Sequence, residues 1–241
     1  MPPAPSPRPA SDLSRLAERL IQPEPLNWVF AGDSITHGVV FTQGYRSYAE
    51  HLHELIRGEL MRVRDVIVNS AVSGRRLTDI LGDFDRCVSS WRPDVVALMI
   101  GTNDVASDVP QPVSADQYAA SLREFVARVR SLGAVCVLQT PPPVDIAHAP
   151  ERSRLAEFAD VVRDVADTDD IILVDQHARL IELSAGGIPW RLMGDPIHPN
   201  AAGHAALAVE MARVLGIRPS PERARTLPML EGLVNAARVH P

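Results

Sequence analysis

The sequence of 241 residues contains no lysine, so all 24 of its basic residues are arginines. Acidic residues outnumber them at 30, and the formal net charge of −6 provides no positive surface for nucleic acid. We therefore expect no nucleic-acid partner. Frequent alanine and proline accompany the missing lysine, which is typical of codon bias in a GC-rich genome rather than of a function.

Cysteine is almost as scarce, with only Cys87 and Cys136 in the chain. Neither has the spacing of a metal ligand, and their surroundings indicate buried free thiols in a reducing compartment. No run approaches the roughly 18 apolar residues that a membrane-spanning helix needs. Residues 1–10 are rich in proline and lack the apolar centre of a secretion signal. These absences predict a cytoplasmic protein without a membrane partner.

Apolar residues, by contrast, make up 46% of the chain, which is enough for a sizeable core in one α/β domain. Short apolar segments alternate with segments of helical periodicity. The alternation predicts a flavodoxin-like three-layer α/β/α sandwich, with a five-stranded parallel sheet of order 2-1-3-4-5. The predicted strands are 26–31, 66–68, 95–100, 134–139 and 171–174. The predicted helices are 13–21, 45–60, 77–91, 114–132, 153–166, 176–184 and 200–215.

The same patterns divide the chain into three parts. Residues 1–25 are expected to form an N-terminal arm with a short helix, and residues 26–216 the α/β domain. Residues 217–241 are expected to form a tail that begins rich in proline and arginine, with a candidate helix over 227–239. Nothing in the sequence decides whether this tail packs on the core or joins two copies of the chain, so a homo-oligomer stays open.

The first predicted strand ends abruptly at Gly32-Asp33-Ser34. Catalytic groups of open α/β sheets collect at the carboxyl ends of strands, which makes Ser34 a candidate nucleophile. The plain alternative is a serine that only caps the next helix. In the predicted strand order, Gly74 and Asn103 follow the two neighbouring strands, so their loops should converge on Ser34.

A serine needs a base, and the segment around His198 offers one. Asp195 precedes His198 by three residues in a turn stiffened by proline, so its carboxylate can reach imidazole Nδ1 and leave Nε2 pointing outward. His37 is closer to Ser34 in sequence, but no carboxylate is obviously placed to orient it. An exposed histidine in an ordinary turn is the alternative for His198.

Acyl transfer also needs donors for a negatively charged oxygen. The backbone N–H groups of Ser34 and Gly74 and the side-chain amide of Asn103 are the candidates. Each has an ordinary structural alternative, because glycine and asparagine are common turn residues.

Taken together, four blocks resemble the SGNH (GDSL-type) esterase/lipase family. They are Gly32-Asp33-Ser34-Ile35-Thr36, Gly74, Gly101-Thr102-Asn103-Asp104 and Asp195-Pro196-Ile197-His198-Pro199, in the family's order. The resemblance implies Ser34 as nucleophile, His198 as base and Asp195 as its orienting partner. It also implies an oxyanion hole formed by Ser34, Gly74 and Asn103, and no metal or organic cofactor. Ile35 stands where the family's older name has leucine, which is a conservative change.

The favoured interpretation is a serine esterase for a small-molecule ester, with short acyl groups such as acetyl on a carbohydrate or small natural product. Lysophospholipase, thioesterase or acyltransferase activity at the same residues stays open. A non-catalytic or nucleotide-binding module is the third alternative, but no glycine-rich phosphate loop follows the first strand. Trp190 and Met193 are candidates for contacting an acyl chain or a sugar ring, or else for packing in the core.

Overall fold

Five parallel strands form the centre of the computed structural model, which describes residues 11–219, 221–222 and 224–239. The strand order is β2-β1-β3-β4-β5, so the predicted order and the flavodoxin-like fold are confirmed. Most of the predicted N-terminal arm, residues 1–10, lies outside the described residues. The strands are β1 (Asn27–Gly32), β2 (Val66–Asn69), β3 (Val95–Met99), β4 (Val135–Gln139) and β5 (Ile172–Val174).

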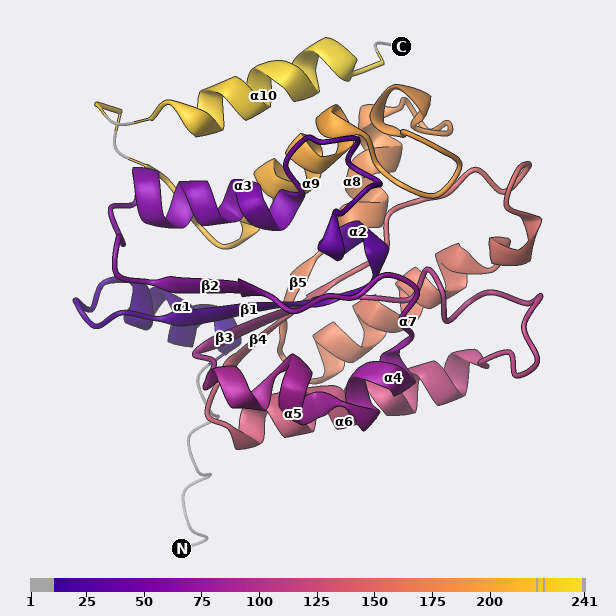
Figure 1. Cartoon of the computed structure of the whole chain (residues 1–241), viewed down its shortest axis with the longest axis horizontal. Coiled ribbons are helices and arrows are strands. Elements are labelled where there is room, and N and C mark those ends of the chain that lie inside the picture. Colours follow the sequence, from indigo (N-terminus) through magenta and orange to yellow (C-terminus); the bar gives the residue numbers. More distant parts are fainter. Residues whose placement is uncertain (1–10, 220, 223, 240–241) are drawn as a thin grey trace, which may run out of the picture.

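Helices cover both faces of this sheet and make three layers (Figure 1). One face is covered by α4 (Leu77–Gly82), α5 (Phe84–Cys87), α6 (Ala115–Ser131) and α7 (Leu155–Thr168). The core of the other face includes α1 (Asp12–Leu20), α3 (Tyr48–Glu54), α8 (Gln176–Leu183) and α9 (Ala201–Val214), with α10 (Thr226–Ala237) packed on α9. The short elements are α2 (Ser34–His37), the π-helix η1 (Leu55–Glu59), η2 (Ser89–Trp91), η3 (Pro150–Arg152) and η4 (Trp190–Leu192).

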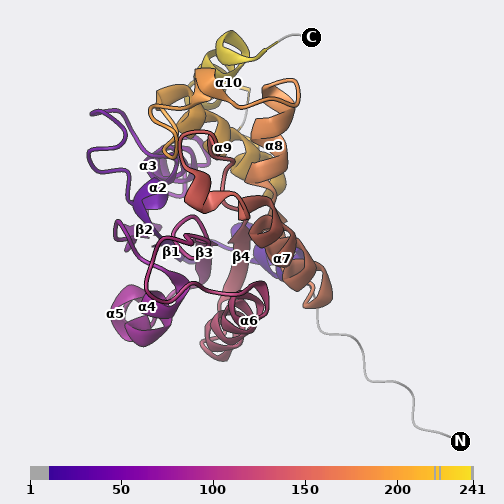
Figure 2. The same ribbon diagram turned by 90° about the vertical axis from the view of Figure 1, so that its right-hand side faces the viewer.

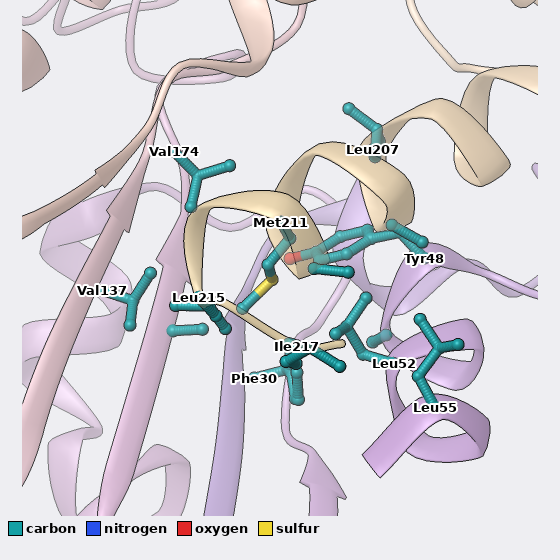
Figure 3. Close-up of a cluster of buried hydrophobic side chains, with 14 of the residues drawn as sticks. Phe30, Tyr48, Leu52, Leu55, Val137, Val174, Leu207, Met211, Leu215 and Ile217 are labelled. Carbon is teal, nitrogen blue, oxygen red and sulfur yellow. The ribbon is translucent and has the colours of Figure 1, made fainter. Parts of the chain in front are cut away.

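The central strand β3 is buried along its whole length and contributes side chains to the hydrophobic cores on both faces of the sheet. Val95, Ala97 and Met99 join the core beneath α3 and α9, whereas Val96 and Leu98 join the core beneath α6 and α7. This alternation follows from the two-residue period of a strand. Figure 3 shows the first of these cores, where side chains from β1, α3 and α9 meet.

One predicted element differs from the structure. The expected continuous helix 77–91 is broken into α4, α5 and η2. The break falls at Gly82 and Asp83, where Asp83 has the non-helical angles φ −118° and ψ 31°. Glycine weakens the helix there, and the Asp83 carboxylate accepts hydrogen bonds from Arg75 Nη2 at 2.6 Å and Arg86 Nε at 2.8 Å. These side-chain bonds hold Asp83 at the break, while its backbone N–H still donates to the Asp79 carbonyl and its carbonyl still accepts the Cys87 N–H.

All strands point the same way, so their carboxyl ends meet at one edge of the sheet (Figure 1). Figure 2 looks onto that edge, where α2 and the longer loops gather. Because β1 lies between β2 and β3, the segments that follow these three strands are neighbours in space. In the part of the chain that the structure describes, no helix is both long and apolar enough to cross a membrane.

Candidate active site

Ser34 is presented by a sharp turn between β1 and the single-turn helix α2. Asp33 caps this helix, with its Oδ1 accepting the Ile35 N–H at 3.0 Å, so Ser34 is the first helical residue rather than the cap. Gly32 must stay small, because a Cβ there would lie 2.4 Å from the Met99 carbonyl oxygen. The turn fixes the Ser34 side chain at the carboxyl edge of the sheet, where it is 7% exposed.

The three residues expected to act together form one hydrogen-bonded chain. Ser34 Oγ lies 2.9 Å from His198 Nε2, and His198 Nδ1 lies 2.7 Å from Asp195 Oδ2. An ionised carboxylate only accepts, so Nδ1 carries the proton and Nε2 is left to accept the Ser34 hydroxyl. This is the tautomer in which an imidazole can remove a proton from serine.

Asp195 is held by its own turn as well as by the imidazole. Its Oδ1 accepts the backbone N–H groups of Ile197 and His198, both at 2.7 Å. Partial burial acts to raise the pKa of Asp195, but these two hydrogen bonds and the His198 imidazole outweigh it and lower the pKa below its usual value. Asp195 therefore stays ionised at neutral pH, which the 43% exposure of its side chain also favours.

Gly74 lies in a turn from Val72 to Arg75, which we call the glycine turn. The Arg75 N–H donates to the Val72 carbonyl at 3.3 Å, and Gly74 has φ +82°, which glycine adopts without strain. Among the described residues, neither the Gly74 N–H nor the Ser34 N–H has a hydrogen-bond acceptor. Free N–H groups beside a serine hydroxyl can stabilise a developing negative charge.

Asn103 follows β3 and reaches the glycine turn. Its Nδ2 donates one hydrogen bond to the Arg75 carbonyl at 3.1 Å. A side-chain amide carries two donors, so a second N–H of Asn103 is left for a ligand. The structure thus brings Asn103 to the segment that carries Gly74, as the strand order predicted.

A buried network of hydrogen-bonded side chains connects α2 to neighbouring elements of the core. Thr36 Oγ1 lies 3.0 Å from the Tyr48 hydroxyl, which also accepts a hydrogen bond from Gln139 Nε2 at 3.0 Å. Gln176 Nε2 donates in turn to Gln139 Oε1 at 3.0 Å. Burial raises the pKa of Tyr48, so its hydroxyl stays protonated. The nucleophile turn is therefore connected to α3, β4 and α8.

Two further carboxyl groups are buried next to this turn. Asp104 Oδ1 accepts the Leu77 N–H at 2.9 Å, while one oxygen of Asp104 and one of Asp33 have no partner among the described residues. Burial is the main reason that the pKa of Asp33 rises to about 7 and that of Asp104 to about 6. The charge of Asp104 raises the pKa of Asp33 further. Asp33 is thus a structural residue that is costly to ionise.

Phe41 is a site residue that the sequence did not reveal. Its ring stacks on the His198 imidazole, with centroids 3.9 Å apart and an interplanar angle of 16°. The preceding Val40 has φ 67°, and the Phe41 N–H bonds back to the Val39 carbonyl at 2.8 Å in a tight, strained turn. No spacing or composition signal marks Phe41, because its partner is distant in sequence.

The two candidate substrate residues differ in accessibility. Trp190 begins η4, is 51% exposed, and has its ring edge-on to His148 with centroids 6.0 Å apart. Met193 is only 7% exposed and pairs with Pro199 in an isolated bridge, which suits a packing role. The segment around His148 joins the turn that carries Asp195 and His198, because the Asp145 N–H donates to the Pro196 carbonyl at 2.8 Å. Of the two, Trp190 is open to a ligand.

No group of three or more histidine, cysteine, aspartate or glutamate side chains among the described residues could hold a metal ion. Cys87 and Cys136 are both free and buried, as expected.

The comparisons with known proteins agree with this geometry. Residues 30–206 match the model of the GDSL-like lipase/acylhydrolase family. An acetylxylan esterase from Geobacillus stearothermophilus is 30% identical over 207 residues, which cover 78% of this chain and 93% of that protein. A crystal structure of that esterase has a TM-score of 0.69 at 28% identity and covers 79% of this chain and 94% of its own. An α/β hydrolase enzyme from the metagenome of Lake Arreo, Spain, has a TM-score of 0.70 at 27% identity, covering 81% of this chain and 97% of its own.

The fold and these matches define the class of the protein, which is a carboxylic ester hydrolase. The chain belongs to the GDSL-like lipase/acylhydrolase family, the SGNH family that its motifs resemble.

Proposed function

We propose that the protein is a serine esterase that works through an acyl-enzyme on Ser34. His198 Nε2 takes the hydroxyl proton as Ser34 Oγ attacks the ester carbonyl carbon. The oxyanion is stabilised by the N–H groups of Ser34 and Gly74 and by the free amide N–H of Asn103. The ester C–O bond then breaks, and His198 returns the proton to the departing alcohol. Water, deprotonated by His198, finally releases the acid and regenerates Ser34.

The observation that carries this proposal is the unbroken hydrogen-bonded chain from Ser34 through His198 to Asp195. Variants of the acetylxylan esterase that are described as catalytic mutants have alanine in place of a serine, an aspartate or a histidine. In that protein the aspartate precedes the histidine by three residues, which is also the spacing of Asp195 and His198. The similarity supports the same roles in this chain.

We further propose a short acyl group, such as acetyl, on a carbohydrate or small natural product. The similarity to an acetylxylan esterase supports the acetyl group and the carbohydrate. The exposed ring of Trp190 offers a flat apolar surface on which a sugar ring can stack. The segment around His148, on which this ring packs, is linked to the turn that carries Asp195 and His198 by the bond from the Asp145 N–H to the Pro196 carbonyl. Longer acyl esters and thioesters are the second candidate.

The test is hydrolysis of p-nitrophenyl esters from acetyl to palmitoyl by the wild type and by Ser34→Ala. We expect the highest kcat/KM for the shortest esters and a loss of at least about 10⁴-fold in kcat for Ser34→Ala, with an unchanged thermal unfolding curve. Ser90→Ala is the matched control, because Ser90 is exposed in η2 at the opposite edge of the sheet. Full activity of Ser34→Ala would rule out the mechanism.

Two outcomes separate the alternatives that use the same residues. A kcat/KM that rises with chain length towards palmitoyl would favour a lysophospholipase or thioesterase over an acetylesterase. Transfer of acetyl to an added alcohol or sugar in preference to water, measured by product analysis, would favour an acyltransferase. Failure of a fluorophosphonate probe to label Ser34 would instead favour a non-catalytic protein.

A further inference from the structure

The glycine turn has little packing to hold it in place. Ser73 and Gly74 are exposed, and a Cβ built on Gly74 would meet no atom within 4 Å. Among the described residues, only the backbone bond from the Val72 N–H to the Gly32 carbonyl, at 3.2 Å, ties the start of the turn to β1. The direction of the Gly74 N–H must therefore be set by hydrogen bonds to the residues beside it.

One of these bonds comes from His37. The Ser73 N–H donates to His37 Nδ1 at 3.3 Å, and Ser73 Oγ lies 3.0 Å from the same nitrogen. A backbone N–H can only donate, so Nδ1 must be unprotonated and the ring is neutral with its proton on Nε2. The Ser73 hydroxyl then donates as well, and both donors of Ser73 converge on one atom.

The other side of Gly74 is held by Asn103, whose Nδ2 donates to the Arg75 carbonyl at 3.1 Å. Gly74 thus lies between two residues that are each fixed by a side chain, Ser73 by His37 and Arg75 by Asn103. We propose that His37 is a positioning residue that aims the Gly74 N–H at the reacting ester, an inference that rests on the proposed function.

The position of His37 gives this contact a second consequence. His37 is the last residue of α2, and Ser34 is the first, so one helical turn carries both the nucleophile and the support of the oxyanion donor. The contact of His37 with Ser73 thereby ties the glycine turn to the same helical turn that carries the attacking oxygen. Such preorganisation acts on the transition state, where the oxyanion exists, rather than on the bound ester.

The test compares His37→Ala with His37→Asn in the hydrolysis of p-nitrophenyl acetate. Asparagine Oδ1 is separated from Cα by the same number of bonds as histidine Nδ1, so it restores an acceptor for Ser73. We expect His37→Ala to lower kcat by about 10–10²-fold with KM within about twofold, because the donor is displaced rather than removed. His37→Asn should recover most of that loss.

A boronic acid that forms a tetrahedral adduct with serine provides a second measurement. Its inhibition constant should rise by about the same factor as kcat falls in His37→Ala, and it should return towards the wild-type value in His37→Asn. Ser73→Ala keeps the N–H donor and loses only the hydroxyl, so we expect a loss of a few-fold in kcat. His53→Ala is the matched control, because His53 is an exposed histidine in α3 whose ring lies 3.3 Å from Arg57 Nη1 and away from the glycine turn.

The outcomes are decisive in either direction. If the wild type is active and the kcat of His37→Ala lies within twofold of the wild-type kcat, the role of His37 is overturned. A loss in kcat that His37→Asn does not recover would overturn it as well. If thermal melting shows that His37→Ala is unfolded, the inhibition constants of the boronic acid for His37→Asn and Ser73→Ala decide the question. A wild type without esterase turnover would instead overturn the proposed function itself.

Discussion

The nucleophile turn after β1 and the glycine turn after β2 lie side by side but are supported differently. β1 is buried along nearly its whole length and is flanked by a strand on each side. β2 is an edge strand in which Val66 is 51% exposed, and the turn that follows it is exposed too. One turn is therefore fixed by the core, and the other by a few hydrogen bonds.

The turn that carries Asp195 and His198 resembles the glycine turn in this respect. Its shape depends on the two backbone N–H bonds to Asp195 Oδ1 and on the bond between the Gly194 N–H and the His198 carbonyl at 2.8 Å. Apart from the nucleophile Ser34 itself, we expect changes on the β1 side to act mainly through the free energy of unfolding. Changes in the two hydrogen-bonded turns should act mainly through kcat.

After Ser34→Ala, the largest effect on turnover without loss of stability is expected for Asp195→Asn. Asparagine Oδ1 can keep the backbone hydrogen bonds, but its amide group donates where the carboxylate oxygen accepted, which favours the wrong tautomer of His198. We expect kcat to fall by about 10³–10⁴-fold while the unfolding midpoint in urea moves little. A variant with more than a tenth of the wild-type kcat would show that Asp195 does not orient His198.

The paired glycine variants Gly32→Ala and Gly74→Ala test the difference in support directly. A Cβ on Gly32 would lie 2.4 Å from a backbone oxygen of β3, so we expect a loss of about 3 kcal/mol or more in the free energy of unfolding. Gly74→Ala meets no atom but has φ +82°, so it should cost about 1 kcal/mol. Denaturant unfolding measures both. Equal losses would contradict the contrast between a core-supported and an exposed turn.

The buried carboxyl of Asp33 predicts a dependence of stability on pH. Its pKa is about 7 in the folded chain against 3.8 for an unperturbed aspartate. Between these values the folded state binds a proton that the unfolded state releases, so the free energy of unfolding falls as pH rises from about 4 to about 7.

Asp33→Asn removes this dependence while its Oδ1 can still accept the Ile35 N–H. We expect the variant to be more stable than wild type by on the order of 4 kcal/mol at pH 8, and the gain to disappear near pH 4. Urea unfolding at the two pH values measures the difference. A gain that is the same at both would mean that ionisation of Asp33 is not its cause.

The smallest effect is expected for Phe41→Ala. Loss of the stacked ring frees the His198 imidazole on one face, and aromatic pairs contribute about 0.5–1.5 kcal/mol, so kcat/KM should fall by about 2–10-fold. Tyr45→Ala in the same loop is the control, because Tyr45 is 64% exposed. Equal activities of the two variants would assign the Phe41 ring no part in holding His198.

The fold could be predicted largely from periodicity, because each buried strand is a short apolar run and each crossover helix is amphipathic. The convergence of the loops that carry Ser34, Gly74 and Asn103 followed from the strand order, since these loops follow three neighbouring strands. The pairing of His198 with Ser34 did not follow from the strand order and was implied only by the resemblance of the motifs. Phe41 could not be predicted, because its stacking partner His198 is distant in sequence and no local pattern links the two rings. The break at Asp83 was missed because it depends on pairing with Arg75 outside the helix.

The contact between Ser34 and His198 also has a consequence for how the chain is made. It joins residues 164 positions apart, and α9, which follows His198, packs against α3. Contacts of such high sequence separation form late in folding, and a ribosome releases the N-terminal strands first. On the proposed mechanism, we expect newly synthesised chains to stay inactive until His198 has emerged, and recovery of turnover after dilution from denaturant to require the docking of α9 as well as the formation of the sheet.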